Sequence, residues 1–247
     1  MMAKSQTRTT SKTRSQTIRA TGAEAGGIES VSLTPGKSLT TNVIDTMESL
    51  QQFDLIDLQQ YTQEKTYLNT ASKDFHLFSV GRDDVHGILK HVLSRVSVSL
   101  YLNMFGYDDD ELNDILMTIA EDKTITMLVT LDASQAGGAH EQALLNKFRA
   151  KDAIAFTTHV AIGRSATHQI SHTKGFVADG KVAGEGSTNW SASGEGTFVT
   201  PGRSGGAGYK AQNNTQSIIT DPDTISRFSA QLVAEHMIVQ RQAAAKT

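Results

Sequence analysis

The chain has 247 residues, of which 38% are hydrophobic and 20% charged, a composition typical of a soluble globular protein with one large domain or one domain with extensions. It contains no cysteine, which excludes disulfides, a thiol nucleophile and cysteine-ligated zinc or iron–sulfur sites. The net charge of −3 divides into +5 over residues 1–23, which contain no acidic residue, and −8 over the remainder (18 basic against 26 acidic side chains), so a basic arm precedes an acidic body.

No apolar run approaches the roughly 20 residues that cross a bilayer, and the first residues lack the apolar core of a secretory signal. We therefore expect a cytoplasmic protein without stable membrane association. Residues 1–40 are rich in Ser, Thr and Gly and predict a disordered basic tail. The acid-free, Arg- and Ser-rich start also resembles an organellar transit peptide, but the lack of an apolar helical face favours a flexible arm.

Residues 41–70 predict a helical extension that precedes the main domain. Thr41 can cap a helix that ends near Thr66 and carries a broad apolar side. Such a helix needs a partner surface, either on the main domain or on another subunit.

From Phe75 onward helices and strands alternate, which predicts one α/β domain with a mixed β-sheet layered with helices over residues 71–247. The predicted helices span 83–92, 109–120, 139–150 and 223–242. The predicted strands span 96–105, 124–131, 153–162, 170–178 and 216–220. The acidic run 108–111 stands directly before a helical pattern, so we interpret it as N-capping and macrodipole matching rather than as a magnesium site.

The segment 171–189, SHTKGFVADGKVAGEGSTN, carries the residues with chemistry. His172 and Lys174 are two apart on a predicted strand, so their side chains leave the same face of the sheet. An imidazole beside an ammonium group forms an anion site, because the lysine supplies charge to phosphate oxygens and the imidazole attacks or transfers a proton. A pair at this spacing is common by chance and is weak support by itself.

Asp179-Gly180, between FVA and KVA, is a strong signal for a tight hairpin. Asp179 is therefore either a turn residue or a direct participant in catalysis, and the sequence leaves both open. If the returning strand lies beside the first, Ser187 and Asn189 come near the histidine and the lysine and offer neutral donors to the same phosphate. Gly186 before them allows a close backbone approach.

These residues resemble the signature of the phospholipase D superfamily, which reads His, any residue, Lys, four residues, Asp, six residues, Gly-Ser-any-Asn. All the fixed positions are present in register, which makes the match specific; they are His172, Lys174, Asp179, Gly186, Ser187 and Asn189. The resemblance covers about residues 75–240, because SVSLYLNMFGYDDDELNDIL and NNTQSIITDPDTISRFSAQLVAEH are similar to the early and final strand–helix units of that fold. It implies a phospholipase D-like fold, and residues 1–70 match nothing that we can place.

The resemblance also implies covalent catalysis through a phosphohistidine, at an active site where two copies of the motif meet. The chain holds one copy, so the economical solution is a homodimer in which two His172 residues face each other across a two-fold axis. One attacks phosphorus, and the other protonates the leaving oxygen and then activates water. Lys174 and Asn189 neutralise the phosphate oxygens, with Ser187 in support. No metal or other cofactor is implied, because lysines supply the charge that divalent ions supply elsewhere.

Short superfamily members with one motif are mostly nucleases, which favours an endonuclease that binds and cleaves DNA or RNA. A phospholipase D-type lipid phosphodiesterase is the alternative, weakened by the acidic body and the lack of a basic amphipathic helix. A catalytically silent binding protein that kept the fold is the third reading, which the complete His–Lys–Asn set opposes.

The sequence departs from the superfamily pattern in two places. The small nucleases have a glutamate before the last strand that orients the catalytic histidine, and here Thr215 or Gln216 holds that place. Gln216 is the candidate substitute, although it accepts a hydrogen bond without charge. An insertion over 193–210 follows Asn189 and should border the site, unless it is a disordered flap. Three of its side chains are candidate substrate contacts: Arg203, Tyr209 and Lys210.

Three histidines raise the question of a zinc site, because His159, His168 and His172 lie within fourteen residues. They lack a fixed short ligand spacing such as His-Glu-x-x-His, so no metal site is predicted. The other histidines are interpreted as surface or helix-face residues: His76, His86, His91, His140 and His236.

Overall fold

The computed structural model describes residues 53–62, 73–165, 167, 170–197 and 211–245. All of these residues belong to the compact unit Leu39–Thr247. The predicted tail over 1–40 and most of the 193–210 insertion lie outside the described residues. So do the candidate substrate contacts Arg203, Tyr209 and Lys210.

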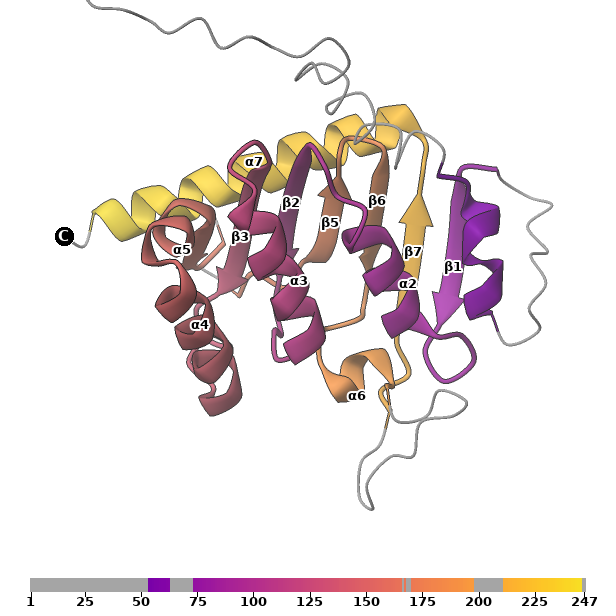
Figure 1. Ribbon diagram of the computed structural model, residues 1–247, viewed down its shortest axis with the longest axis horizontal. Helices are drawn as coiled ribbons and strands as arrows, with labels where there is room; N and C mark the ends of the chain where they lie inside the picture. Colours follow the sequence, from indigo (N-terminus) through magenta and orange to yellow (C-terminus); the bar gives the residue numbers. More distant parts are fainter. Residues whose placement is uncertain (1–52, 63–72, 166, 168–169, 198–210, 246–247) are drawn as a thin grey trace, which may run out of the picture. The chain divides into compact units, whose positions relative to one another are not determined.

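A mixed sheet of seven strands lies at the centre of the described part of the chain (Figure 1). The strands are β1 (Phe75–Ser79), β2 (Ser99–Met104), β3 (Thr126–Asp132), β4 (Val160–Gly163), β5 (Lys174–Ala178), β6 (Val182–Gly186) and β7 (Thr215–Ile219). Their order across the sheet is β1-β7-β6-β5-β2-β3-β4. β2, β3 and β4 pair in parallel, and the other neighbours are antiparallel. The predicted α/β class and mixed sheet are confirmed.

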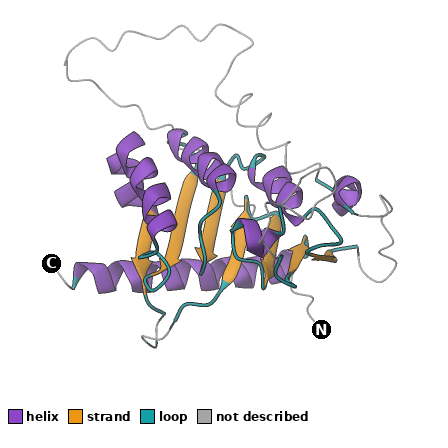
Figure 2. Ribbon diagram, turned by 90° about the horizontal axis from the view of Figure 1, so that it is seen from below, coloured by secondary structure: helices purple, strands orange, loops and turns teal. Residues whose placement is uncertain are grey.

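Helices cover both faces of this sheet, as the view turned by 90° shows (Figure 2). The long helix α7 (Pro222–Ala244) lies across one face, against β2 to β6. The opposite face carries the helices α2 (Val85–Leu93), α3 (Asp110–Glu121) and α4 (Ala139–Lys151). The shorter helices are η1 (Leu55–Tyr61), α5 (Ala153–His159) and α6 (Ala192–Glu195). The predicted helices at 83–92, 109–120, 139–150 and 223–242 are therefore present, with ends shifted by one or two residues.

Two hydrophobic cores follow from the alternation of side chains along the strands. On β5, Phe176 packs into the larger core on the α2 and α3 side, and Val177 packs into the smaller core beneath α7. Lys174 is two residues before Phe176, so it shares the face of the larger core, where it is buried. A charged side chain at the end of an apolar row indicates a functional position rather than a packing one.

The helix α3 begins as the acidic run predicts. The N-cap Asp109 has extended backbone, and its carboxylate accepts a hydrogen bond from the backbone N–H of Leu112 at 2.8 Å. Asp110 and Glu111 occupy the first turn, where negative charge is favourable. The capping interpretation of residues 108–111 is confirmed, and the buried side chain of Asp109 has a second contact that is described below.

The predicted strand over 153–162 is wrong in its first two thirds. Residues Ala153–His159 form the helix α5, and only Val160–Gly163 pair with β3. The cause is Asp152, which accepts a hydrogen bond from the backbone N–H of Ala155 at 2.7 Å and so starts a helical turn. The apolar spacing of this stretch suits either structure, and the cap decides between them.

The predicted helix from Thr41 to Thr66 is also corrected where the structure describes it. Asp54 has extended backbone and forms a capping box with Asp57, so a new 3-10 helix begins at Leu55 instead of continuing an earlier one. Leu55 and Leu58 are buried in the larger core. Of the two partner surfaces that the sequence left open, the main domain therefore receives the apolar side of this segment.

Candidate active site

The segment before β5 is fixed by hydrogen bonds to the ends of two other strands. The backbone N–H of Ser171 donates to the carboxylate of Asp132 at 2.7 Å, and the Ser171 hydroxyl contacts the Asn103 amide. β5 therefore begins at Lys174, and His172 lies in the segment before the strand, not on it as predicted. The alternation of side chains along a strand therefore does not explain why His172 and Lys174 lie together. The two side chains are nevertheless in contact.

His172, Lys174 and Phe105 form one cluster past the end of β2. Met104 pairs with Lys174 across the antiparallel strands, so Phe105 comes next to His172. The two rings are 4.5 Å apart between centroids, and the Lys174 ammonium nitrogen is 5.0 Å from the Phe105 ring centre. The same nitrogen donates to the His172 carbonyl oxygen at 2.8 Å and lies 3.2 Å from His172 Nδ1. Sequence reasoning misses Phe105, because only the strand register brings it here.

The two polar partners of this cluster differ in exposure. Lys174 is 3% exposed, whereas His172 is exposed. Burial lowers the pKa of Lys174, and the charge of Glu185 opposes this effect. Because an ammonium group only donates, its contact with Nδ1 assigns the proton of a neutral imidazole to Nε2. The neutral His172 ring therefore directs its Nδ1 lone pair at the lysine charge, and an exposed imidazole lies beside a buried ammonium group.

The Asn189 side chain contacts the loop that holds Phe105 and Gly106. Its Oδ1 accepts a hydrogen bond from the backbone N–H of Gly106 at 3.2 Å, and the backbone N–H of Trp190 donates to the Gly106 carbonyl at 3.0 Å. A Cβ atom on Gly106 would lie 2.9 Å from Asn189 Cγ, so only glycine allows this approach. The structure thus places Asn189 against the loop that holds Phe105.

Ser187 and Gly186 fix the strand that leads to Asn189. The Ser187 hydroxyl donates to Asn214 Oδ1 at 3.1 Å and accepts from the backbone N–H of Thr215 at 3.0 Å. A Cβ atom on Gly186 would lie 2.2 Å from the Thr215 carbonyl oxygen, so glycine at this position allows the backbone of β7 to approach closely. Ser187 is exposed, so its hydroxyl remains reachable from solvent.

Gln216 does not reach the histidine that it was expected to orient. It is 1% exposed, and its Nε2 donates to the carbonyl oxygen of Ser217 at 3.1 Å. Gln216 pairs with Gly186 on β6. Gly175 of β5 pairs with Glu185 of β6, so the next position along both strands places Lys174 opposite Gly186. Gln216 therefore lies in the same cross-strand row as Lys174, and the described side chains of Gln216 and His172 share no hydrogen bond.

Asp179 lies at the opposite end of β5 from the cluster. It and Gly180 both have positive φ, at 53° and 61°, as the Asp-Gly hairpin requires. The Asp179 carboxylate accepts hydrogen bonds from the backbone N–H groups of Ser97, Val98 and Ser99 and from the Ser97 hydroxyl. This position is that of a structural anchor that holds the start of β2 to the hairpin.

Several other histidines differ from the sequence interpretation. His86, His91 and His236 are buried, whereas His140 is exposed. His159 Nδ1 hydrogen-bonds the Met127 carbonyl at 2.9 Å on the far part of the sheet, and His168 lies outside the described residues. Within the described ranges, one set of metal-type ligands converges, and its members are His86, Asp109 and Glu195. No sequence pattern marks His86 or Glu195 as a ligand, because they stand 109 residues apart.

The His86–Glu195 pair is buried and coupled to its acidic neighbours. Burial, with the charge of Asp109, raises the pKa of Glu195 to about 8. Burial lowers the pKa of His86, but the hydrogen bond and charge of Glu195 outweigh it, so the net shift is upward. Both shifts mean that the pair keeps a proton to a higher pH than either group would alone.

No protein-family model and no curated protein matches the chain in sequence. Among solved structures the chain is similar to the phospholipase D family member Nuc from Salmonella typhimurium, with 12% identity over 66% of this chain and 94% of that one and a TM-score of 0.48. NucT from Helicobacter pylori has 16% identity over 65% and 94% of the two chains, also with a TM-score of 0.48. A phosphatidylserine synthase from Haemophilus influenzae Rd KW20 has 12% identity, covering 75% of this chain and 39% of its own, with the same TM-score. These are likenesses of fold.

None of the helices in the described ranges combines the length and the apolar character that crossing a membrane requires.

Proposed function

We propose that the chain is a metal-independent phosphodiesterase of the phospholipase D type that cleaves DNA or RNA. The observation that carries this proposal is the meeting of His172, Lys174 and Asn189 around the Phe105-Gly106 loop, with every fixed residue of the motif in place. An exposed imidazole above a buried ammonium group is suited to a phosphate, because the nucleophile is accessible and the charge is partly desolvated.

In the proposed reaction His172 Nε2 attacks phosphorus, and a phosphorus–nitrogen bond forms as the bond to the leaving oxygen breaks. The leaving oxygen takes a proton from a second imidazole, and that imidazole then removes a proton from the water that releases the phosphohistidine. Nε2 must first lose its proton. A bound phosphate draws the Lys174 ammonium from neutral Nδ1 to an anionic oxygen, since charge-assisted hydrogen bonds are stronger, and Nδ1 is then free to carry the proton.

The second imidazole is the His172 of another copy of the chain. One motif supplies one histidine, and its exposure leaves it accessible to a symmetry mate. The proposed unit of function is a homodimer with both motifs at a single shared site. Nucleic acid is the preferred substrate because of the basic arm over residues 1–23, which can contact a polyanion.

The test is a panel of substrates in EDTA with the full chain. We expect cleavage of plasmid, single-stranded DNA or RNA, and no release of headgroup from phosphatidylcholine vesicles. Headgroup release without nucleic-acid cleavage would assign the lipid phosphodiesterase instead. Binding of nucleic acid without cleavage would assign a silent binding protein, and cleavage that depends on added magnesium would contradict the proposed mechanism.

The pH dependence of cleavage should report on Lys174. The ammonium form is the active one, and burial lowers its pKa. Activity is therefore expected to fall, as pH rises, at a pH below the value of about 10.4 at which an exposed lysine loses its proton. In Lys174→Arg the guanidinium stays charged through this range, so the alkaline fall should disappear from whatever activity remains. Binding of inorganic phosphate, followed over the same pH range, gives the same comparison if turnover is too slow. An unchanged alkaline limb in the arginine variant would assign it to another group.

A further inference from the structure

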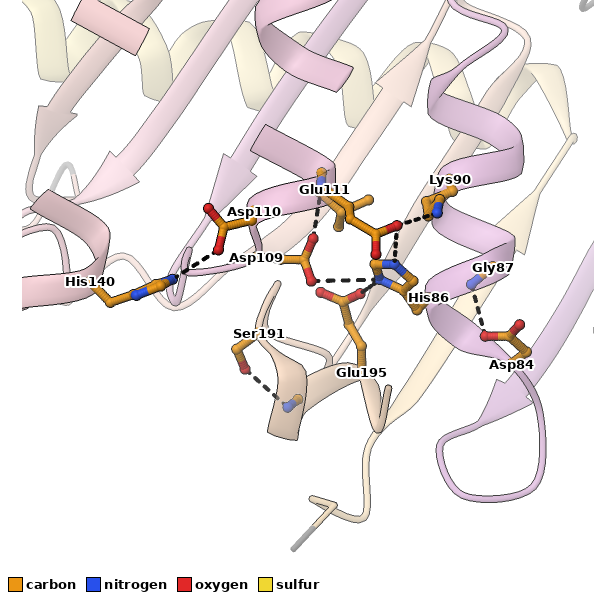
Figure 3. Close-up of polar contacts among 12 residues, drawn as sticks. Asp84, His86, Gly87, Lys90, Asp109, Asp110, Glu111, His140, Ser191 and Glu195 are labelled. Atoms are coloured by element: carbon orange, nitrogen blue, oxygen red, sulfur yellow. Dashed lines mark hydrogen bonds and ion pairs between the residues drawn. The ribbon is translucent and has the colours of Figure 1, made fainter. Parts of the chain in front are cut away.

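Three buried side chains from three separate elements converge on one point beside α6 (Figure 3). His86 comes from the first turn of α2, Asp109 is the N-cap of α3, and Glu195 ends α6. His86 Nδ1 lies 2.5 Å from Glu195 Oε2 and 3.7 Å from Asp109 Oδ2. One ligand atom from each residue lies within 4.8 Å of the other two.

A hydrogen bond between His86 and Glu195 does not satisfy this group of atoms. The Glu195 side chain is fully buried, and its second oxygen, Oε1, has no hydrogen-bond partner among the residues that the structure describes. A proton shared by Nδ1 and Oε2 still leaves Oε1 unpaired. A second carboxylate, that of Asp109, also lies against the same nitrogen. Buried carboxylate oxygens are rarely left in this state without an ion or water to pair them.

The other ring nitrogen of His86 already has a hydrogen-bond partner. Its Nε2 is 3.4 Å from Glu111 Oε2, and Glu111 also pairs with Lys90. An imidazole that donates Nε2–H to Glu111 directs the lone pair of Nδ1 at the two carboxylates. This carboxylate–histidine order is the one that fixes the ring and tautomer of histidines that bind metals.

We propose that His86, Asp109 and Glu195 bind a divalent transition-metal ion of the zinc or manganese type. Zinc ligands lie about 2.0–2.2 Å from the ion, so two tetrahedral ligand atoms are roughly 3.4 Å apart. The 3.7 Å from Nδ1 to Asp109 fits this spacing, and the 2.5 Å contact between Nδ1 and Glu195 must lengthen by about 0.9 Å when an ion replaces the proton. One imidazole with two carboxylates favours zinc or manganese over calcium and magnesium, which prefer oxygen ligands alone.

The surface offers a route for a cation to this point. A cleft of about 500 Å³ opens at the start of α3 and is lined by four successive acidic residues, Asp108, Asp109, Asp110 and Glu111. Asp109 belongs both to the cleft and to the ligand set. Acidic walls raise the local concentration of cations, so the ion would enter at Asp109 and reach His86 and Glu195 behind it.

The site is separate from the phosphodiesterase cluster in its ligands and in its effect. Asn189 and Trp190 precede Ser191, the N-cap of α6, and the Trp190 carbonyl accepts a hydrogen bond from the backbone N–H of Asp108 at 2.7 Å. An ion that ties α6 to α2 and α3 would hold the chain that carries Asn189 in place. It stabilises the fold beside the active site and takes no part in the proton and phosphoryl transfers at His172.

The experiment is metal binding to chelator-stripped full-length protein, with zinc and manganese chlorides as the probes. We expect one equivalent per chain by equilibrium dialysis and a melting temperature several degrees higher with zinc, since an ion that binds only the folded state stabilises it. Glu195→Gln and Asp109→Asn each remove a ligand charge at nearly constant volume, and asparagine keeps the helix cap. Each should weaken binding by about 100-fold or more, beyond the 10–100-fold typical of residues that only orient a ligand. Glu121→Gln, which removes an exposed carboxylate at the other end of α3, is the matched control and should bind as the wild type does.

Stripped wild type that binds neither ion, or variants at Glu195 and Asp109 that bind as tightly as the wild type, would overturn the site. The proposal is independent of the phosphodiesterase reaction, because His172→Ala should bind zinc with unchanged stoichiometry and affinity. Loss of cleavage in EDTA that Glu195→Gln also shows without EDTA reports on this site. Loss of cleavage in EDTA by the wild type, with Glu195→Gln still active in the absence of EDTA, instead reports on the proposed mechanism.

Discussion

Replacement of His172 by alanine is expected to lower kcat for phosphodiester cleavage by at least about 10⁴-fold, because the proposed nucleophile and the proposed general acid are both this residue in the two subunits. The fold should be unaffected. His172 is exposed and precedes β5, and the Ser171 contacts that fix the segment do not involve its side chain. Exposed substitutions of this kind change stability by about 0.5 kcal/mol or less, which is about 2 °C in melting temperature for a chain of this size.

The measurement is single-turnover cleavage of the substrate that the panel identifies, with the melting temperature recorded for each variant. His140→Ala serves as the control, since that side chain is 53% exposed and its 3.6 Å contact is with Asp110 on the surface. Cleavage at more than about 1% of the wild-type rate in His172→Ala, far above what the loss of a nucleophile leaves, would remove His172 from the chemistry. Phosphate label that stays on the wild-type chain at high pH, and is absent from the variant, would identify the phosphohistidine directly.

Local signals explain what could be predicted from the sequence. The Asp-Gly pair requires positive φ at two successive positions, and Asp179 and Gly180 have it. The acidic residues before 112 predict the start of α3, and Asp109 caps it. The motif itself is a local string, so its six residues are found without knowledge of the fold. Each of these inferences depends on residues that are close in the chain, where spacing and side-chain chemistry are sufficient.

Contacts between distant segments could not be predicted in this way. Phe105 comes to His172 because Met104 pairs with Lys174, and a register one residue different would turn every side chain of the strand to the other face. His86 and Glu195 meet because the fold brings the first turn of α2 close to the end of α6, and neither residue has a neighbour in sequence that marks it. The strand predicted over 153–162 is wrong for a different reason, because the deciding signal there is local. The apolar pattern of this stretch favours a strand, and the helix cap at Asp152, which starts α5, outweighs it.

The orientation of the His172 imidazole, the proposed nucleophile, is where the structure changes the sequence expectation most. The sequence predicts that Gln216, in place of a glutamate, holds the ring, and Gln216 instead bonds the backbone beside it. The ring of His172 has Phe105 on one side and the Lys174 ammonium at Nδ1. These contacts fix the ring plane without supplying an acceptor for an Nδ1 proton. The proton on Nδ1 must therefore be stabilised by a group that arrives with substrate or with the second subunit.

That requirement makes the mixed dimer the most informative protein to test. A dimer with one wild-type subunit and one His172→Ala subunit is expected to retain less than about 2% of the wild-type turnover, not the half that two independent sites would give. The single remaining imidazole can attack phosphorus, but no second imidazole protonates the leaving oxygen or activates water. At most one substoichiometric burst of product should appear, with the phosphate left on the wild-type chain.

Two different affinity tags and sequential purification isolate this mixed dimer, and a mixed dimer with one His140→Ala subunit controls for handling. Half activity in the His172→Ala mixed dimer, or full activity in a protein that sediments as a monomer, would contradict the shared site. The distinction follows from chemistry that one histidine cannot perform alone. A base that has become covalently bonded to phosphorus cannot at the same time activate the water that must attack it, so each motif depends on a second proton-transfer group. The only motif histidine that this chain offers for that task is His172 of another copy.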